Sequence, residues 1–316
     1  MTKSILLGAL ALLISSTSAL AQQAEEPQAD RVDDIIVIAR RSDVPVWEVS
    51  RGDRSMILVG SIRGIPRDLE WSPDGLEQAT ARADRVLYPP TARISPADIF
   101  RLIWRGRSVT QLPEGRTSAD YLDPSVHARL ETVMADESDD WRTSSFFLLG
   151  INLMNDHAGF SGRRGRDAED AVREAARRGR IEGQSVGFVR GDEIVDNLIT
   201  QSPEVYRPCI GAAVAAAEVG PESFNQRATD WRARRVPEVM ANPLDIALGQ
   251  CWPWGDPEIG PQLRGQWLTA LSDAVEQPGV TLAVAPLRLL AEPGGVLDGL
   301  EADGFDIVGP EWRGED

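Results

Sequence analysis

Apolar and polar positions predict strands near both ends of the chain. Residues 46–49 alternate between apolar and polar, Gly52 and Asp53 supply turn chemistry, and residues 56–59 form a short continuous apolar run. This pattern predicts a β-hairpin whose second strand is buried. Three further short apolar runs predict strands at residues 85–88, 280–285 and 305–308.

Helical periodicity fills the chain between these strands. Ser72-Pro73 and Ser95-Pro96 each place a capping residue before a proline at the first helical position, which predicts helices ending near residues 83 and 105. Apolar residues at helical spacing predict further helices at 124–135, 141–156, 166–178, 204–219, 222–235, 259–276 and 295–303. We therefore expect a single α/β domain, in which N- and C-terminal strands build a central mixed β-sheet covered by a helical middle segment.

The first 21 residues have the pattern of a signal peptide. Lys3 is basic, residues 5–14 are apolar but too few to span a bilayer, and Ala19-Leu20-Ala21 is a small-residue cleavage site. We therefore expect an exported protein, periplasmic or secreted after cleavage near Ala21/Gln22, with no membrane span in the mature chain. An amphipathic N-terminal helix is the alternative.

Residues 22–44 are expected to form a flexible leader or arm, before a domain at 45–310 and a tail at 311–316. Residues 22–31 are polar and acidic, which is typical of disorder. Residues 33–40 join two aspartates to a β-branched run. This run resembles a TonB-box-like segment of exported bacterial outer-membrane receptors, but an edge strand or extended arm is the simpler interpretation.

The composition excludes several kinds of chemistry. The chain has 33 basic and 49 acidic residues, a formal net charge of −16, and Lys3 as its single lysine. Lys3 lies in the expected signal peptide, so the mature chain would have no lysine. It could therefore form no Schiff base on a lysine and could offer no P-loop lysine to a nucleotide phosphate. The acidic balance opposes non-specific binding to nucleic acid or anionic lipid, so no nucleic-acid partner is expected. Two histidines and two cysteines make a zinc site of several such ligands improbable.

The two cysteines, Cys209 and Cys251, are an even number in a chain expected to be exported. An oxidising compartment favours a disulfide between them. Two separate buried thiols are the alternative.

The segment Gly183-Gln184-Ser185-Val186-Gly187 matches the G-x-S-x-G nucleophile elbow of α/β-hydrolases. That motif needs a strand before the serine and a histidine after it. Both histidines, His127 and His157, precede Ser185, and residues 179–182 make a poor strand. We therefore do not expect Ser185 to be a nucleophile.

Two segments together resemble the TraB/GumN family. The apolar strand at 56–59, followed by Gly60-Ser61-Ile62-Arg63 and Pro66, is similar to the family's strand, G-T-I-H motif and proline. Ala285-Pro286-Leu287-Arg288 is similar to its later G-x-x-H motif. The resemblance covers about residues 46–310 and implies a fold related to Tiki-type metalloproteases, erythromycin esterases and ChaN-like proteins. It implies metal-dependent hydrolysis for some relatives.

The departures from this family pattern fall on the residues that would hold a metal. Arg63 and Arg288 stand in place of the two histidines, and Ala285 in place of a glycine. Two family glutamates have no counterpart at the end of strand 85–88 or at Ser185, and the E-R-N segment keeps only Arg227. Arginine offers donors and no acceptor, and it stays protonated. We therefore expect a degenerate site with no metal, no other cofactor and no catalytic residue, and a protein closer to a pseudoenzyme than to an enzyme.

Several roles remain open for the arginines of this degenerate site. Arg63, Arg288 and Arg227 together would suit a carboxylate, phosphate or sulfate group of a small anionic ligand. Alternatively they have a structural role, pairing internally with acids such as Asp68, Glu70 or Glu292. A metal-independent or residual peptidase- or esterase-like activity, or a protein-interaction module of the cell envelope, are further alternatives.

Overall fold

The computed structural model describes residues 28–52, 54–160 and 165–314. The expected signal peptide and residues 22–27 of the expected leader lie outside the described residues. The described residues form a mixed α/β structure with one large sheet, which confirms the expected fold class.

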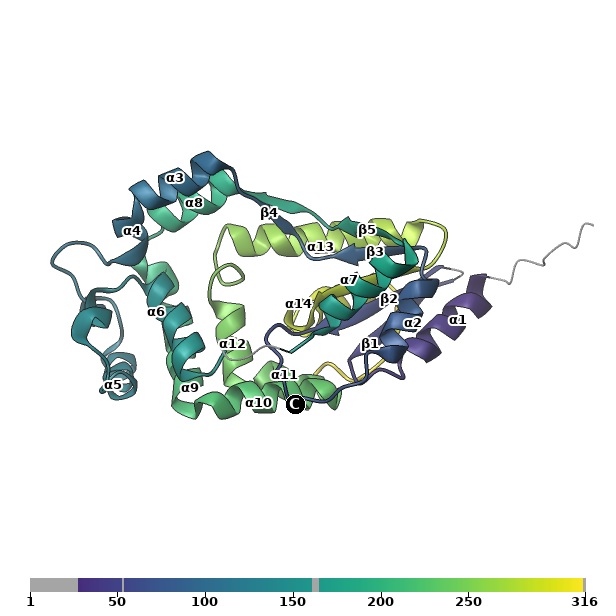
Figure 1. Ribbon diagram of the computed structural model, residues 1–316, viewed down its shortest axis with the longest axis horizontal. Helices are drawn as coiled ribbons and strands as arrows, with labels where there is room; N and C mark the ends of the chain where they lie inside the picture. The colour runs from purple at the N-terminus through teal and green to yellow at the C-terminus, as the bar shows by residue number, and fades with distance from the viewer. Residues whose placement is uncertain (1–27, 53, 161–164, 315–316) are drawn as a thin grey trace, which may run out of the picture.

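The central sheet has six strands in the order β5-β3-β7-β2-β1-β8 (Figure 1). The strands of this sheet are β1 Val46–Arg51, β2 Arg54–Ser61, β3 Arg85–Tyr88, β5 Glu182–Ser185, β7 Thr281–Pro286 and β8 Asp306–Val308. β2, β7, β3 and β5 run parallel, and β1 is antiparallel to both β2 and β8. The sheet therefore joins both ends of the chain, as the apolar pattern predicts.

The predicted hairpin is confirmed as β1 and β2. Val46 pairs with Val59 and Arg51 with Arg54 across its tight turn. Residues 56–59 are fully buried because β2 lies inside the sheet with a layer of helices on each face. A strand buried on both faces needs a continuous apolar run rather than an alternating one.

Fifteen α-helices lie in the described part of the chain, with short 3₁₀ and π turns. The first eight are α1 Gln28–Ala39, α2 Asp74–Arg82, α3 Pro96–Trp104, α4 Gly106–Thr110, α5 Pro124–Val133, α6 Phe146–Asn152, α7 Ala168–Gly179 and α8 Gly191–Thr200. The others are α9 Arg207–Val219, α10 Pro221–Arg232, α11 Val236–Ala241, α12 Pro243–Gln250, α13 Ile259–Glu276, α14 Leu287–Ala291 and α15 Val296–Ala302.

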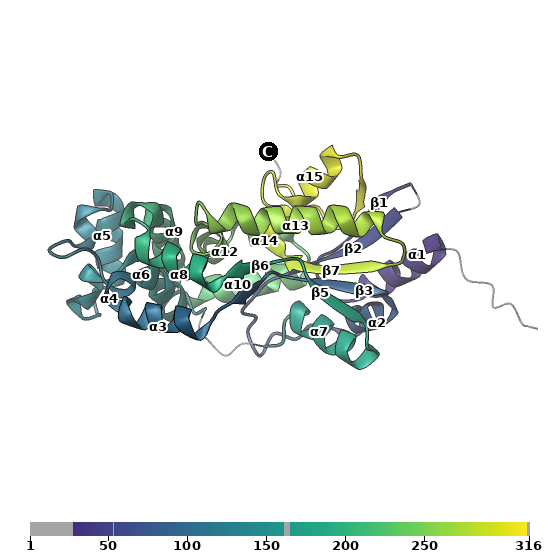
Figure 2. The same cartoon turned by 90° about the horizontal axis from the view of Figure 1, so that it is seen from above.

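The helices divide into those that cover the sheet and those that pack on each other. Figure 2 shows α2 and α7 on one face of the sheet and α13 with α15 on the other. α4, α5, α6 and α9 lie beyond the end of the sheet (Figure 1), and α5, α6 and α9 share a second apolar core with α12. A small two-stranded sheet, β4 Thr91–Arg93 and β6 Phe188–Arg190, leads from the main sheet toward α3 and α8.

The sulfur atoms of Cys209 and Cys251 lie 2.06 Å apart, at disulfide distance. Cys209 is on α9 and Cys251 directly follows α12, and both are buried in the second core. The pair therefore links two helices that already pack together. The expected pairing agrees with this geometry.

The interpretation of residues 33–40 as an extended arm or edge strand is wrong, because residues 33–39 belong to α1 and Arg40 directly follows it. Ile35, Ile36, Ile38 and Ala39 are buried, while Val37 is exposed. This spacing is that of one helix face, and it packs against α2 and β2. Tertiary burial here overrides the strand preference of a β-branched run.

Three helix boundaries also differ from the expectation. α2 begins after Pro73, so Ser72 is not its cap, whereas Ser95 does cap α3, with Pro96 in its first turn. The helix expected at 141–156 is broken by extended backbone at Ser144 and Ser145 into a 3₁₀ turn at Asp139–Thr143 and helix α6. The helix expected at 204–219 likewise starts with a 3₁₀ turn.

Candidate functional site

The main cavity lies at the edge of the sheet where the four parallel strands end. β2, β3, β5 and β7 all point their carboxyl ends to this edge, which is where ligands bind in open α/β sheets. The cavity has a volume of about 610 Å³ and is closed on its far side by residues of α6, α8, α12 and α13. This volume is within the usual range for small-molecule sites.

The motif positions Gly60, Ser61 and Ala285 are brought together by strand pairing. Gly60 faces Ala285 and Ser61 faces Pro286 in the parallel register of β2 and β7. A Cβ atom on Gly60 would lie 2.6 Å from Leu287 Cδ1, so a larger residue at this position would require the Leu287 side chain to shift. Trp231 Nε1 of α10 donates a hydrogen bond of 2.8 Å to the Gly60 carbonyl. Arg63 and Arg288 therefore leave the sheet at equivalent points of two neighbouring strands.

Two of the three expected arginines share one buried carboxylate. Arg227 Nε donates to Asp245 Oδ1 and Arg288 Nε donates to Asp245 Oδ2, both at 2.7 Å. The side chains of Arg227 and Asp245 are 5% and 3% exposed, and that of Arg288 is 21% exposed. Both arginines also donate hydrogen bonds to the backbone. Arg227 Nη1 donates to the Arg63 carbonyl, and Arg288 Nη2 donates to the Met240 carbonyl.

Asp245 is held in place by the start of α12. Asn242 caps this helix, and its side chain accepts hydrogen bonds from the backbone N–H groups of Leu244 and Asp245. A carboxylate in the first turn of a helix is stabilised by the helix dipole. Gly249, one turn further along, leaves room for Arg288, since a Cβ there would lie 2.3 Å from Arg288 Cδ. The local sequence of α12 is therefore arranged around this ion-paired triad, Arg227–Asp245–Arg288.

Arg63 is placed differently from the other two arginines. It is exposed and lines the cavity, and Gly64 turns the chain after it with φ of +72°. Among the described residues, its guanidinium forms no hydrogen bond or ion pair. Neither Asp68 nor Glu70 pairs with Arg63 or Arg288 in this part of the chain, and Glu292 pairs with Arg264 instead.

Asp167 is the titratable group near Arg63 whose pKa is shifted most. The pKa of Asp167 is raised from 3.8 to about 6, mainly by burial and also by the neighbouring charges of Asp170 and Glu169. The backbone N–H of Asp170 and the charge of Arg63 lower this pKa. Asp167 also caps α7, accepting from Asp170 N at 3.0 Å.

The remaining charges of the cavity are paired, and most of its wall is apolar. Glu292 receives two hydrogen bonds from Arg264, of 2.6 and 3.2 Å, and Glu169 receives two from Arg173. Arg63 is therefore the cavity arginine whose guanidinium has no hydrogen bond or ion pair to an acid among the described residues, although its charge acts on Asp167. The apolar side chains of the wall come from many parts of the chain and include Ile62, Ile151, Met154, Ile194, Leu248, Trp252, Trp254, Ile259, Leu263, Leu287 and Leu289.

The strand ends where the resemblance implies glutamates hold Tyr88 and Ser185. Tyr88 is buried, and the guanidinium of Arg173 lies 4.1 Å from its ring centroid. Burial raises the pKa of the Tyr88 hydroxyl. Ser185 ends the strand β5, which begins at Glu182, the last residue of the segment 179–182 that was expected to make a poor strand. Its hydroxyl lies within hydrogen-bond distance of the Pro89 and Gly187 carbonyls, to either of which it can donate.

The donor set at this edge does not fit the divalent metal that the resemblance implies. A metal ion needs lone pairs from carboxylate or neutral imidazole, and guanidinium groups have none to give. The buried carboxylate, Asp245, already binds two guanidinium groups. No cluster of three or more His, Cys, Asp or Glu side chains suited to a metal occurs among the described residues.

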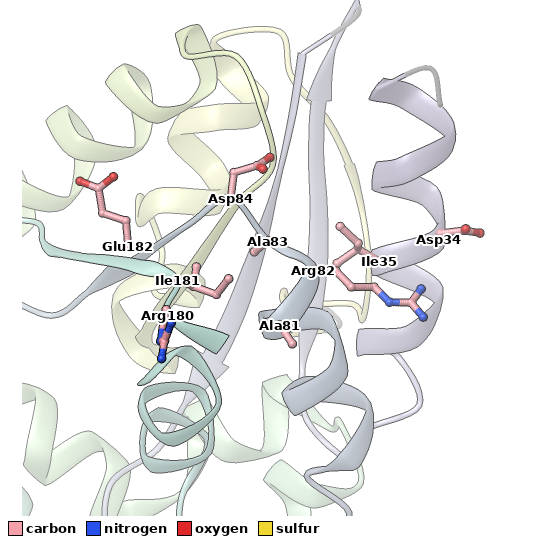
Figure 3. Close-up of a pocket in the computed structure, with 9 residues that line it drawn as sticks. All are labelled: Asp34, Ile35, Ala81, Arg82, Ala83, Asp84, Arg180, Ile181 and Glu182. Atoms are coloured by element: carbon pink, nitrogen blue, oxygen red, sulfur yellow. The ribbon is translucent and has the colours of Figure 1, made fainter. Parts of the chain in front are cut away.

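A second cavity, of about 650 Å³, lies at the opposite, amino end of the strands (Figure 3). It is formed where α1 and the end of α2 face the start of β5, and its charged residues include Arg82, Arg180 and Glu182. In the close-up these side chains spread apart instead of converging on one point. None of the motif residues lies here, so the cavity at the carboxyl ends is the better candidate for a functional site.

Asp245 is the central residue that reasoning from the sequence missed. It lies in a helix that the periodicity did not predict, because α12 is short and apolar on more than one side. The available signal was Asn242-Pro243, a capping residue before a proline, the same device that marks α3 at Ser95-Pro96.

Together these features define an α/β protein with a largely apolar cavity at the carboxyl ends of its parallel strands and arginines at the motif positions. The model of the TraB/PrgY/gumN family matches residues 45–308, nearly the whole described chain. The chain therefore belongs to the TraB/PrgY/gumN family. Comparisons with curated proteins and with solved structures found no match. No helix in the described part of the chain has the length and apolar character needed to cross a membrane.

Proposed function

We propose that this TraB/PrgY/gumN protein is exported and binds a small anionic ligand with an apolar body, without metal-dependent catalysis. The ligand would occupy the cavity at the carboxyl ends of β2, β3, β5 and β7, with its anionic group on Arg63. The observation that carries this proposal is that Arg63 lines the cavity and that its guanidinium forms no hydrogen bond or ion pair among the described residues.

The three expected arginines would therefore divide their roles. Arg227 and Arg288 are neutralised by Asp245 and would serve as a scaffold, as the structural alternative expects. Arg63 would serve as the anion contact, as the binding alternative expects. A guanidinium can donate two parallel hydrogen bonds to a carboxylate or phosphate, and these are stronger than neutral ones.

The apolar wall supports the choice of ligand class. Trp252 and Trp254, on the loop after Cys251, line this cavity together with leucine and isoleucine side chains. Cavities of this kind bury most of a small ligand against apolar and aromatic side chains, while a few polar groups fix its orientation. An alkyl or aryl carboxylate or phosphate matches both parts of the site, whereas inorganic sulfate matches Arg63 alone.

Thermal unfolding in the presence of a ligand panel tests this proposal. The panel pairs alkyl carboxylates and alkyl phosphates with the neutral alcohols of equal chain length. A ligand that binds only the folded state raises Tm, so we expect the anionic amphiphiles to stabilise more than the alcohols. Arg63→Gln should abolish this difference, whereas Arg207→Gln, an exposed arginine on α9, should leave it unchanged. No anion-dependent shift in the wild type would contradict the proposal.

Export is tested separately from ligand binding. Protein recovered from the cell envelope or the medium is expected to begin near Gln22 when its N-terminus is sequenced. A chain that keeps Met1 and stays in the cytoplasm would contradict export while leaving the cavity proposal standing.

A further inference from the structure

Helix α3 has an apolar face that is exposed to solvent. Ile99, Phe100, Ile103 and Trp104 are 53%, 64%, 74% and 78% exposed. The residue that this helix buries is Asp98, which forms a capping box with Ser95. A surface helix normally buries its apolar stripe and exposes its polar residues. In α3 the apolar stripe is exposed and a polar residue is buried.

The four residues form one continuous surface. Ile99 and Ile103, and Phe100 and Trp104, are spaced four apart and so lie on one side of the helix. The rings of Phe100 and Trp104 stack with centroids 6.1 Å apart. α3 lies on the outside of the molecule in both views, away from the main sheet, with α8 packed on its inner side (Figures 1 and 2). We refer to Ile99, Phe100, Ile103 and Trp104 as the α3 face.

The segment that carries the α3 face is basic, opposite in sign to the whole protein, whereas the neighbouring helix α8 carries the acids Asp192, Glu193 and Asp196. Residues 91–108 contain four arginines, Arg93, Arg101, Arg105 and Arg107, and all four are exposed. The acid in this segment is Asp98, which is buried. Arg101 pairs with Asp196, while the guanidinium groups of Arg105 and Arg107 have no ion pair among the described residues. A chain of net charge −16 thus carries a local basic patch beside its exposed apolar helix.

We propose that the α3 face binds an anionic lipid surface, so that the protein attaches peripherally to a membrane. Exposed Trp, Phe and Ile on one side of a helix, flanked by arginines, is the arrangement of helices that lie in the membrane interface. Arginines near the surface of an anionic leaflet add electrostatic attraction. The overall acidity does not prevent this, because repulsion from distant acids is screened beyond about 8 Å at physiological salt.

A second copy of the chain is a less suitable occupant. In a two-fold symmetric contact the same patch faces itself, so Arg105 and Arg107 of one copy would approach those of the other. Like charges brought together in an interface are costly. An anionic surface offers the complementary charge that a second α3 face lacks.

Vesicle co-sedimentation tests the proposal. The protein should begin at Gln22, because the apolar segment at 5–14 would enter lipid by itself, and the described cores lie wholly after this point. The vesicles are phosphatidylcholine alone, or phosphatidylcholine with one third phosphatidylglycerol. We expect binding to the anionic vesicles and a loss of about tenfold or more in the double variant F100S/W104S. The matched control is V37S/V308S, which changes two exposed apolar residues elsewhere and should bind like the wild type.

A second variant tests how much the arginines beside the α3 face contribute to vesicle binding. R105Q/R107Q should weaken binding to the anionic vesicles and make it less sensitive to salt, while leaving the weaker binding to phosphatidylcholine unchanged. Wild-type protein that fails to sediment with anionic vesicles would overturn the proposal. So would vesicle binding that F100S/W104S leaves intact. A dimer in sedimentation equilibrium that F100S/W104S dissociates, without vesicle binding, would assign the α3 face to a second copy instead.

Discussion

Arg63 and Arg288 occupy equivalent places in the fold, yet their surroundings differ completely. Each follows the carboxyl end of a central strand, and the two strands pair directly. Arg288 meets a buried carboxylate that it shares with Arg227, whereas Arg63 is exposed at the cavity wall. Arginines at equivalent points of two neighbouring strands therefore have different surroundings, depending on whether the second half of the chain supplies an acid. Asp245 supplies it for Arg288.

The largest effect should come from removing that acid. Asp245→Ala leaves two guanidinium groups, one of them fully buried, without a counter-charge, and should lower the free energy of unfolding by about 3–5 kcal/mol. Urea unfolding followed by circular dichroism measures this. Asp123→Ala, which breaks the exposed pair with Arg207, is the control and should cost less than about 1 kcal/mol. Equal effects of the two variants would show that the triad is not a structural unit.

A smaller effect is expected from removing one arginine of the triad. Arg288→Met keeps the aliphatic volume, and Arg227 still neutralises Asp245, so the loss should be about 2 kcal/mol. The double variant Arg288→Met/Asp245→Ala should cost less than the sum of the single variants, since the two residues contact each other. Additive effects would argue against direct coupling.

Asp167 allows the surroundings of Arg63 to be probed through pH. Its pKa is raised to about 6 in the folded chain, above its usual 3.8. The folded state therefore keeps this proton to higher pH than the unfolded state, so the Asp167 contribution is fully present below pH 3.8 and is lost as the pH rises through about 6. Relative to Asp167→Asn, the wild type should lose about 2 kcal/mol over this window.

Unfolding curves at a series of pH values measure that difference. Asparagine can still cap α7, so the variant tests the charge rather than the cap. Arg63→Gln should raise the pKa of Asp167 further, because the charge of Arg63 lowers it. A wild type and an Asp167→Asn variant with the same pH dependence would contradict a buried, perturbed carboxyl beside Arg63.

The smallest stability effect should be that of Arg63 itself. An exposed side chain without a hydrogen bond or ion pair in the described part of the chain contributes little to folding, so Arg63→Gln should change the free energy of unfolding by less than about 0.5 kcal/mol. Urea unfolding in ligand-free buffer measures it. If Arg63→Gln lowered the free energy of unfolding by about 2 kcal/mol or more, Arg63 would have a structural role like that of Arg288.

Much of the sheet could be predicted from the sequence, because its strands carry strong local signals. The run at 56–59 and the hairpin turn before it specify β1 and β2 without further information. Helix α13 was predicted with the same limits that the structure has, 259–276, because its periodicity continues over five turns. The family resemblance is confirmed over residues 45–308.

The remainder depends on contacts that sequence position does not specify. The pairing of Arg288 with Asp245 joins two short helices 43 residues apart, and Asp245 has no local feature that distinguishes it from other acids. Residues 33–40 look like a strand by composition but become helical because α2 and β2 bury one side of them. Helix α3 was predicted correctly, yet its apolar positions gave no indication that they face solvent.

The most direct test of the proposed function is a calorimetric titration of the best anionic amphiphile from the ligand panel into the wild type, Arg63→Gln and Arg207→Gln. We predict that the Arg63→Gln variant binds at least about tenfold more weakly, the loss of one charge-assisted interaction of roughly 1.5–3 kcal/mol. Arg207→Gln should match the wild type. Equal affinity for all three proteins would contradict the assignment of the cavity to an anionic ligand held by Arg63.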